Sequence, residues 1–350
     1  MKVVVTGASG NIGTALLRAL RDEDWDVTAI ARRPPPLEPP YHRARWVRCD
    51  IGGSGAADVL TEACTGADAV VHLAWAIHPR ATEPPMWLTN RLGAVNVLRA
   101  AAAADVRHLV CASSAAAYAV APRRYRVPES WPCAGVPGSA YSAGKVTLEA
   151  LLDDFAQGHP AIDLARIRPC SVVQGDAGSE LGDWVVSPYM PRTLLGRPWL
   201  PIPAWPALRL QVVHSDDVAA ALHLILRGGH VGPFNLAGEP VLSAQRLVGA
   251  AGGIRIPLPR SMLVPPAWAT WRLGLQPLHP GWLRLADRTS LVDSTRARTE
   301  LDWRPRHSAN STFGELVEGM RADRHTGSPA LAPSSTPPGL GWPSHQSQKP

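Results

Sequence analysis

A run of β-branched residues leads directly into a glycine-rich turn and a helix at the start of the chain. Residues 3–13 read VVVTGASGNIG, with glycines at positions 7, 10 and 13. Gly7 can adopt a left-handed turn, Gly10 lets the main chain approach a pyrophosphate, and Gly13 lets the helix lie against the strand. The free N–H groups at the start of the helix would face phosphates. This order predicts a nucleotide site; the alternative is a glycine-rich turn without a ligand.

Strand-like and helix-like segments alternate over the first half of the chain, which is typical of a parallel sheet covered on both faces. We therefore expect an α/β fold, a Rossmann-type doubly wound parallel sheet with a small C-terminal substrate lobe. The expected helices are Ile12–Arg21, Met86–Ala104 (entered through Pro84 and Pro85) and Tyr141–Phe155. The expected strands are Val3–Thr6, Asp26–Ala31, Arg45–Arg48, Ala69–His72, His108–Ala112 and Ile162–Ile167.

The pattern becomes irregular after Arg168-Pro169. A strand Leu210–Val213 precedes a helix with Ser215 as its expected N-cap, and Phe234–Leu236 is strand-like. Short helices are expected near Ala244–Ala250, Ala267–Leu273 and Ser294–Leu301. We expect residues 1–180 to form mainly the cofactor domain and residues 181–320 mainly the substrate lobe, with segments returning to the sheet. Residues 321–350, rich in proline, glycine and serine, predict a disordered tail.

The composition excludes several classes of protein. The net charge is +6, but charged residues make up only 18% of the chain and form no long basic block, which argues against nucleic-acid binding. The five cysteines contain no C-x-x-C pair, so neither a disulfide framework nor a metal site is expected. We find no signal peptide and no apolar run long enough to cross a membrane, and we expect a cytoplasmic protein. The sequence leaves a homodimer open.

Residues 141–145 read YSAGK and place a tyrosine and a lysine on one face of a helix. A tyrosine with its ordinary pKa of about 10 is a poor base, so proton transfer requires a nearby positive charge. Ser113 and Ser114 follow the fifth expected strand, at the edge where parallel sheets bind ligands. A serine hydroxyl there could hold a substrate oxygen beside Tyr141. The alternative is a solvated helix face and serines that satisfy the backbone.

Several motifs together resemble the extended short-chain dehydrogenase/reductases, the NAD-dependent epimerase/dehydratase family. They are TGASGNIG at 6–13, HLA at 72–74, Ser113-Ser114 before Ala117-Tyr118-Ala119, YSAGK at 141–145, Arg168-Pro169, VHSDDVA at 213–219 and LDWRP at 301–305. The resemblance covers about residues 1–320. It implies the acid/base role for Tyr141, its activation by Lys145, and the substrate-orienting hydroxyl for Ser114. Asn90 matches an asparagine that the family places on the helix behind the site.

The resemblance also implies the cofactor contacts. Asp50 resembles the residue that meets adenine, Ala74 lies where the phosphates and ribose pass, Lys145 could bind a ribose hydroxyl, and Pro169 abuts nicotinamide. The expected cofactor-binding residues are Gly7, Ser9, Gly10, Asn11, Ile12, Gly13, Arg32, Arg33, Asp50, Ile51, Leu73, Ala74, Lys145 and Pro169.

The end of the second expected strand departs from the pattern of an NAD site. An acidic residue there would accept a hydrogen bond from the ribose 2′-hydroxyl, whereas Ala31 is followed by Arg32 and Arg33. Two arginines suit a 2′-phosphate, so we expect NADP, with NAD as the alternative. They could also be solvated in a proline-rich loop.

The expected activity is NAD(P)-dependent hydride transfer at a secondary alcohol or ketone of a small molecule or nucleotide sugar. Arg209 could meet a substrate phosphate, and tryptophans beyond residue 180 could form either an apolar substrate wall or core packing. The alternatives are a nucleotide-sugar 4-epimerase with tightly bound NAD, or a non-catalytic dinucleotide-binding sensor or scaffold protein.

Overall fold

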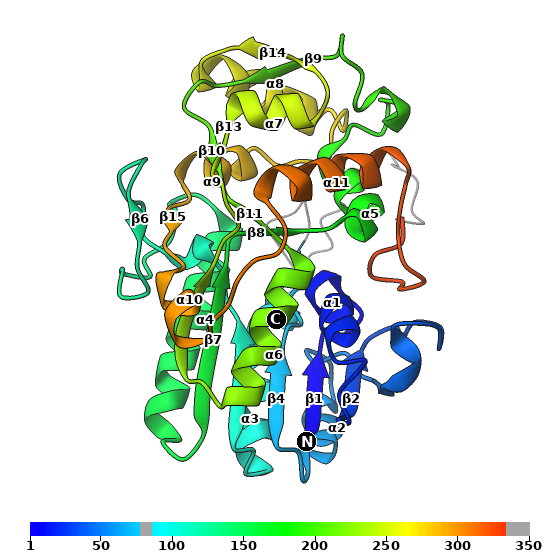
Figure 1. Ribbon diagram of the computed structural model, residues 1–350, viewed down its shortest axis with the longest axis vertical. Helices are drawn as coiled ribbons and strands as arrows, with labels where there is room; N and C mark the ends of the chain where they lie inside the picture. Colours follow the sequence, from blue (N-terminus) through cyan, green and yellow to red (C-terminus); the bar gives the residue numbers. More distant parts are fainter. Residues whose placement is uncertain (78–85, 334–350) are drawn as a thin grey trace, which may run out of the picture.

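The structure, a computed structural model, describes residues 1–77 and 86–333. Its centre is a seven-stranded parallel sheet in the order β12-β7-β5-β4-β1-β2-β3 (Figure 1). The strands are β1 Lys2–Thr6, β2 Asp26–Ala31, β3 Arg45–Arg48, β4 Ala69–His72, β5 His108–Ala112, β7 Asp163–Pro169 and β12 Gly232–Leu236. From β1 the chain continues to β2 and β3 on one side, and it then crosses to β4 on the other side of β1. Such a switch point opens a ligand crevice at the carboxyl ends of the strands.

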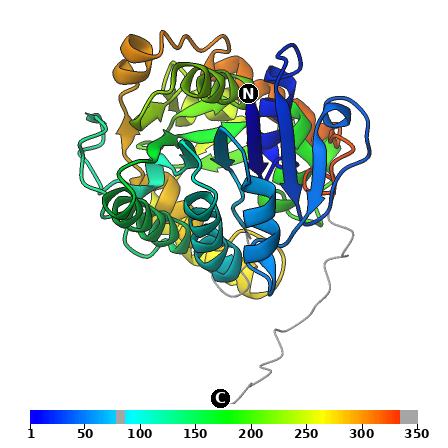
Figure 2. The ribbon, with the colours of Figure 1, turned by 90° about the horizontal axis from the view of Figure 1, so that it is seen from below.

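Helices cover both faces of the sheet (Figure 2). One face packs against α1 (Asn11–Ala19) and α6 (Ser215–Gly228), whose buried residues include Leu16 and Leu222. The other packs against α2 (Ala56–Cys64), α3 (Ala94–Ala103) and α4 (Ala140–Gly158), through residues such as Leu60 and Leu148. The Rossmann-type α/β fold is therefore confirmed.

Expected strands and observed strands agree closely, because runs of β-branched residues define the buried parallel strands. Helix boundaries agree less well. The helix expected over Met86–Ala104 contains a π-helical stretch at Leu88–Gly93 before α3, and Pro84 and Pro85 lie outside the described residues. The expected strand Leu210–Val213 is two strands, β10 (Arg209–Leu210) and β11 (Val212–His214).

A smaller lobe lies above the carboxyl edge of the sheet in Figure 1. Its paired strands are β8 (Ser171–Val173) with β11, β9 (Pro201–Ala204) with β14 (Ile254–Pro257), and β10 with β13 (Leu242–Ser243). Its helices are α5 (Gly178–Val185), α7 (Ala244–Ala250), α8 (Arg260–Arg272), α9 (Gly281–Arg288) and α11 (Ala309–Arg321). A short pair, β6 (Arg126–Val127) with β15 (Leu291–Val292), and α10 (Thr295–Glu300) complete the described elements.

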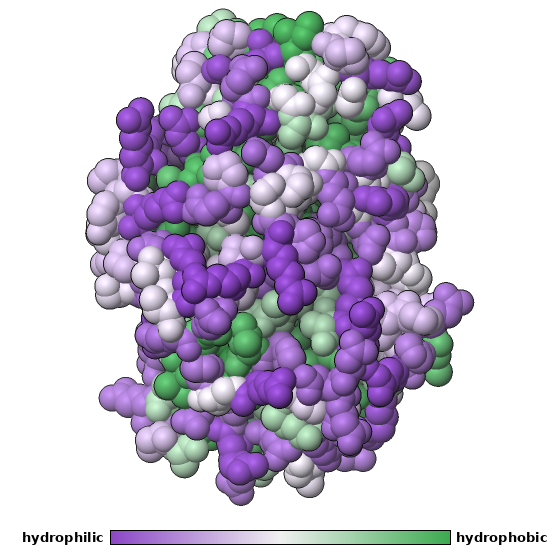
Figure 3. Space-filling model, in the orientation of Figure 1, coloured by the Kyte–Doolittle hydropathy of each residue, from purple (hydrophilic) through white to green (hydrophobic). Residues whose placement is uncertain are grey.

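Hydrophilic residues dominate the face shown in Figure 3, and apolar groups are visible both over the small lobe and over the lower half of the molecule. Exposed apolar side chains of that lobe include Ile254, Met262 and Trp268. Trp205 and Trp303 are buried instead, so these two tryptophans serve core packing. Among the described residues, no helix is long and apolar enough to cross a membrane.

The chain after α11 differs from the expected disordered tail. Residues 322–333 have a defined path, and Ser328 and Leu331 are fully buried. Composition alone did not indicate this, because the burial depends on contacts with loops near the N-terminus. The remainder of the expected tail, residues 334–350, lies outside the described residues.

Candidate active site

The turn after β1 requires glycine at two of the predicted positions. Gly7 has a φ of +70°, and a Cβ there would lie 2.6 Å from the Ala74 nitrogen. A Cβ at Gly13 would lie 2.3 Å from the Gly7 carbonyl oxygen. The start of α1 is therefore packed directly onto the turn. At Gly10 the nearest such contact is 3.4 Å, which leaves room above the loop.

A cavity opens above this turn, and most of the expected cofactor-binding residues meet there. Its walls include Gly7, Ser9, Gly10, Arg32, Arg33, Asp50, Ile51, Leu73 and Ala74. Trp75, Ala76 and Ala330 contribute further wall that the sequence did not indicate. Arg32 makes no hydrogen bond or ion pair with any other described residue, so its guanidinium is available to a ligand.

The other expected cofactor residues lie outside the lining of this cavity: Asn11, Ile12, Gly13, Lys145 and Pro169. The Asn11 side chain donates to the Val172 carbonyl (2.9 Å) and accepts from Gln174 (2.7 Å) and Ser215 (2.6 Å). Asn11 thus ties the start of α1 to the small lobe. Pro169 ends β7, where it pairs with Leu236 of β12.

Tyr141 and Ser114 meet at the carboxyl edge of the sheet. Tyr141 is in the first turn of α4, and Ser114 follows β5, where its hydroxyl accepts from the Ala116 N–H at 3.1 Å. Burial raises the pKa of Tyr141, and a hydrogen bond with Ser114 opposes that rise. The phenol is therefore protonated at neutral pH, in the state that can donate a proton to an oxygen.

Lys145 lies one turn further along α4 and is fully buried. Its Nζ donates to the Ala112 carbonyl at 2.9 Å. It also lies 3.5 Å from the centroid of the Trp75 ring. Burial lowers the pKa of Lys145 to about 7, although Glu149 and Cys111 favour the charged form. At neutral pH this amine is close to the midpoint of its titration.

Asn90 holds the chain that leaves β4. Its Oδ1 accepts from the Ala76 N–H at 2.7 Å, and its Nδ2 donates to the Ala76 carbonyl at 2.9 Å. Both polar groups of this side chain are thus used to position the segment that carries Trp75. Trp75 itself was missed; its only sequence signal is its place directly after the HLA motif.

A second cavity, of about 300 Å³, opens beside Tyr141. Trp75 and Ala76 line both cavities and so lie at their junction. The walls of the second cavity are largely apolar, with Ile77, Met86, Trp87 and Trp282 joined by Asn90, Arg91 and His279. The Trp282 ring lies 5.4 Å from the Tyr141 ring. Arg209 lines neither cavity and donates to the Leu208 carbonyl.

A buried ionic cluster supports α4 from behind. Arg168 donates to both oxygens of Glu149 at 2.7 and 2.8 Å, and Arg166 donates to the same carboxylate at 2.8 Å. Burial alone would raise the pKa of Glu149, but the guanidinium groups outweigh it and hold the pKa at about 2. Arg168 also donates to the Tyr118 hydroxyl at 2.9 Å. The cluster therefore joins α4 to β7.

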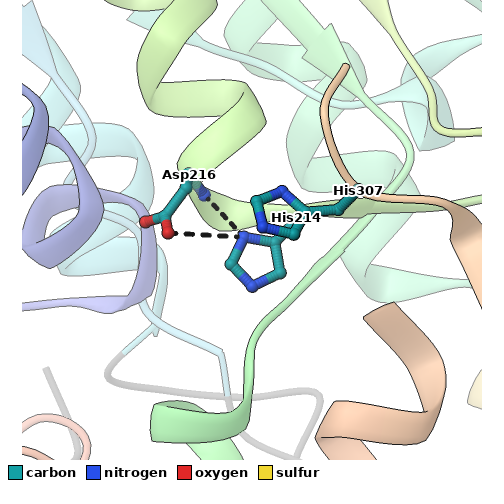
Figure 4. Close-up of side chains that lie close together, drawn as sticks. All are labelled: His214, Asp216 and His307. Atoms are coloured by element: carbon teal, nitrogen blue, oxygen red, sulfur yellow. Dashed lines mark hydrogen bonds and ion pairs between the residues drawn. The ribbon is translucent and has the colours of Figure 1, made fainter. Parts of the chain in front are cut away.

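His214, Asp216 and His307 form a further cluster at the start of α6 (Figure 4). His214 Nδ1 accepts from the Asp216 N–H at 3.1 Å, and its Nε2 lies 3.1 Å from Glu315. His307 stacks on His214 and lies 3.2 Å from Asp217. Because these nitrogens have protein partners, we assign the cluster to capping α6. His214, rather than the expected Ser215, is the N-cap.

Known proteins match this chain over most of its length. The profile of the NAD dependent epimerase/dehydratase family matches residues 3–237, from β1 through β12. The chain belongs to this family. The glycine turn, Ser114, Tyr141 and Lys145 lie within the matched range.

Curated relatives of different activities are similar to this chain in sequence. The UDP-glucose 4-epimerase of Mycolicibacterium smegmatis is 28% identical over 333 residues, covering 92% of this chain and 99% of that protein. The L-arabinose 1-dehydrogenase (NAD(P)(+)) of Haloferax volcanii is 36% identical over 172 residues, covering 45% of this chain and 62% of that protein.

Solved structures show the same fold. The UDP-glucose 4-epimerase of Thermus thermophilus, solved in complex with NAD, has a TM-score of 0.68 at 20% identity and covers 92% of this chain and 99% of that chain. The dTDP-glucose 4,6-dehydratase of Streptomyces venezuelae has a TM-score of 0.67 at 21% identity and covers 92% of this chain and 98% of that chain.

Proposed function

We propose that the chain is an NADP-preferring oxidoreductase that interconverts a secondary alcohol and a ketone of a small molecule. The observation that carries the proposal is the pairing of Tyr141 with Ser114 beside the buried Lys145. These three groups lie at the sheet edge that also carries the glycine turn.

The cavity above the glycine turn fits a dinucleotide. Gly10 leaves room above the loop backbone, and the N–H groups at the start of α1 suit a pyrophosphate. Arg32 and Arg33 line the cavity beside Ala31, where an NAD site would have an acidic residue. Guanidinium groups bind phosphate in a bidentate manner, which favours the 2′-phosphate of NADP.

The chemistry of the chain's own residues is proton transfer and orientation. When bound, the nicotinamide supplies or accepts hydride at the substrate carbon. Ser114 holds the substrate oxygen, and the protonated Tyr141 donates to that oxygen as the alcohol forms. In the reverse direction Tyr141 accepts the proton, and the positive charge of Lys145 favours the phenolate that must form first.

The second cavity favours an apolar, ring-containing substrate. Its volume is that of a small-molecule site, and aromatic walls such as Trp75 and Trp282 suit the faces of a ring. Among the described residues of its lining, Arg91 is the one side chain with a permanent positive charge. A nucleotide sugar carries a diphosphate, which family members with such substrates must pair with cationic or N–H groups.

A nucleotide-sugar 4-epimerase is the second candidate, because the similarity to the UDP-glucose 4-epimerase of Mycolicibacterium smegmatis covers 99% of that protein. An epimerase returns the hydride to its substrate and shows no net change in the nicotinamide. The test is to incubate the pure protein with panels of ring ketones and of UDP- and dTDP-sugars while following NADPH absorbance and sugar products separately.

Net NADPH oxidation with a ketone is the expected result. Sugar interconversion without net oxidation would identify the epimerase instead. If the protein binds the cofactor but turns over neither panel, and Tyr141→Phe binds the cofactor equally well, a dinucleotide-binding sensor or scaffold would be favoured.

A further inference from the structure

A segment from the far end of the chain, residues 326–331, lies against the loops of the proposed cofactor cavity. The Ser328 hydroxyl donates to the Ser9 carbonyl in the glycine turn at 2.6 Å. Ser328 and Leu331 are fully buried, although neither belongs to a helix or strand. Figure 1 shows this red end of the chain running down from α11 past α5 toward the blue N-terminal elements. Specific contacts thus hold this segment in place, although it contains serine, proline and glycine.

The same segment contacts the loop that follows β2. The Thr326 and Tyr41 hydroxyls are 2.6 Å apart, and Tyr41 is itself buried and within 3.1 Å of the Thr14 hydroxyl on α1. A Cβ at Gly327 would lie 3.7 Å from Pro36. The segment therefore joins the glycine turn, α1 and the loop after β2.

Arg33 is the direct link to the proposed specificity of the site. Its Nη2 donates to the Pro329 carbonyl at 3.3 Å. A carbonyl is neutral and uses one of the five N–H donors of a guanidinium, so the charge and the remaining donors stay available to a phosphate. Ala330, the next residue, lines the cavity together with Arg32 and Arg33.

We propose that residues 326–331 are a wall of the adenosine half of the cofactor site and hold Arg33 in place beside the 2′-phosphate. This inference rests on the proposed preference for NADP. Arginine on a mobile loop must lose side-chain freedom when it binds, and a side chain held in advance loses less. On this proposal the affinity for NADPH depends on a segment far away in the sequence, since Pro329 lies 296 positions after Arg33.

The decisive variant places a negative charge in this wall of the full-length protein. Ala330→Glu puts a carboxylate beside Arg32 and Arg33, where it competes with the 2′-phosphate, whereas Ala330→Gln adds the same bulk without the charge. We expect Ala330→Glu to weaken NADPH binding about tenfold or more in calorimetric titration, since close like charges repel strongly. The affinity of the Glu variant for NADH should change less than threefold. The affinity of the Gln variant for NADPH should also change less than threefold.

A second set of proteins tests the anchoring of the segment. Ser328→Ala removes the bond to Ser9, and a chain ending at residue 325 removes the whole segment; a chain ending at residue 333 is the matched control. We expect the 1–333 chain to match the full-length protein, and both other changes to weaken NADPH binding more than NADH binding. The point variants keep the test decisive if the 1–325 chain does not fold.

Three results would overturn the inference. Ala330→Glu and Ala330→Gln could affect NADPH equally, Ser328→Ala and the 1–325 chain could keep full affinity, or removal of the segment could tighten binding, which would make it an inhibitory plug. Full-length protein that binds neither dinucleotide would instead overturn the proposed function. Full-length protein that prefers NADH would overturn the NADP preference.

Discussion

The Lys145 ammonium lies 3.5 Å from the centre of the Trp75 indole ring. The same Nζ donates to the Ala112 carbonyl, and Trp75 forms part of the wall of both cavities. The ring therefore covers the amine to which the proposed function assigns a role beside Tyr141. A cation held against an aromatic face in a dry site gains about 1–2 kcal/mol.

Loss of this aromatic face should lower the pKa of Lys145 further. Trp75→Leu keeps an apolar cover but removes the attraction for the ammonium, so we expect a decrease of up to about one pH unit from the value near 7. The shift can be followed by NMR of the isotopically labelled lysine side chain. Trp282→Leu, which alters the other side of Tyr141, is the control. An unchanged titration of Lys145 in Trp75→Leu would contradict the prediction.

Stability at alkaline pH should depend on Lys145. Its pKa is about 7 in the folded state and near its ordinary 10.5 in the unfolded chain, so between these values the unfolded state binds more protons. This group then makes the protein more stable as pH rises from about 7 to 10, by up to about 1.4 kcal/mol per pH unit.

Lys145→Met lacks this titration. The free energy of unfolding of the variant minus that of the original should therefore decrease as pH rises from 7 to 10. Urea unfolding at four pH values without cofactor measures it. A difference that stays constant with pH would show that the buried amine keeps an ordinary pKa.

Tyr141→Phe tests the proton donor. The change removes one oxygen, so fold and cofactor affinity should survive while turnover on an identified substrate falls about 10²- to 10⁴-fold. Ser114→Ala should also lower turnover with little effect on cofactor affinity, and Ser113→Ala should do less. Steady-state kinetics and cofactor titration of the same preparations separate these effects. Full activity in Tyr141→Phe would refute the assignment.

The arginine pair should set the cofactor preference. Arg32→Ala should weaken NADPH binding by about 1.5–3 kcal/mol, the range for hydrogen bonds to charged groups, and leave NADH binding nearly unchanged. Arg33→Ala should act in the same direction. Calorimetric titration with both dinucleotides measures the preference, and equal losses for NADPH and NADH would contradict the role in reading the 2′-phosphate.

Glu149→Gln should destabilise the whole domain. The change leaves Arg166 and Arg168 buried without their shared carboxylate, which costs about 3–5 kcal/mol for comparable buried pairs. Asp153→Asn is a matched control on the same Arg166, because the Asp153 side chain is 71% exposed and its loss should cost about 1 kcal/mol or less. Denaturant unfolding compares the two, and equal losses would contradict the prediction.

Local sequence patterns were sufficient to predict the sheet and the proximity of Ser114 and Tyr141. Strands β2, β4 and β5 carry their own signal in short apolar runs, and a serine after a parallel strand must lie at its carboxyl edge. The hydrogen bonds from Gln174 and Ser215 to Asn11 could not be predicted from local patterns, because they depend on how the small lobe returns to α1. The burial of Ser328 could not be predicted either, because it depends on a contact with Ser9, far away in the sequence.

The edge strand β12 comes from residues 232–236, well after the point where the irregular half of the chain begins. It pairs with β7 along Ala165–Pro169, and Phe234 and Leu236 are fully buried there. A fragment that stops near residue 180 would thus expose a row of unpaired N–H and C=O groups along β7, a template for aggregation. We therefore expect that neither half of the molecule folds alone. A fusion or split version should be cut in exposed loops rather than between the lobes.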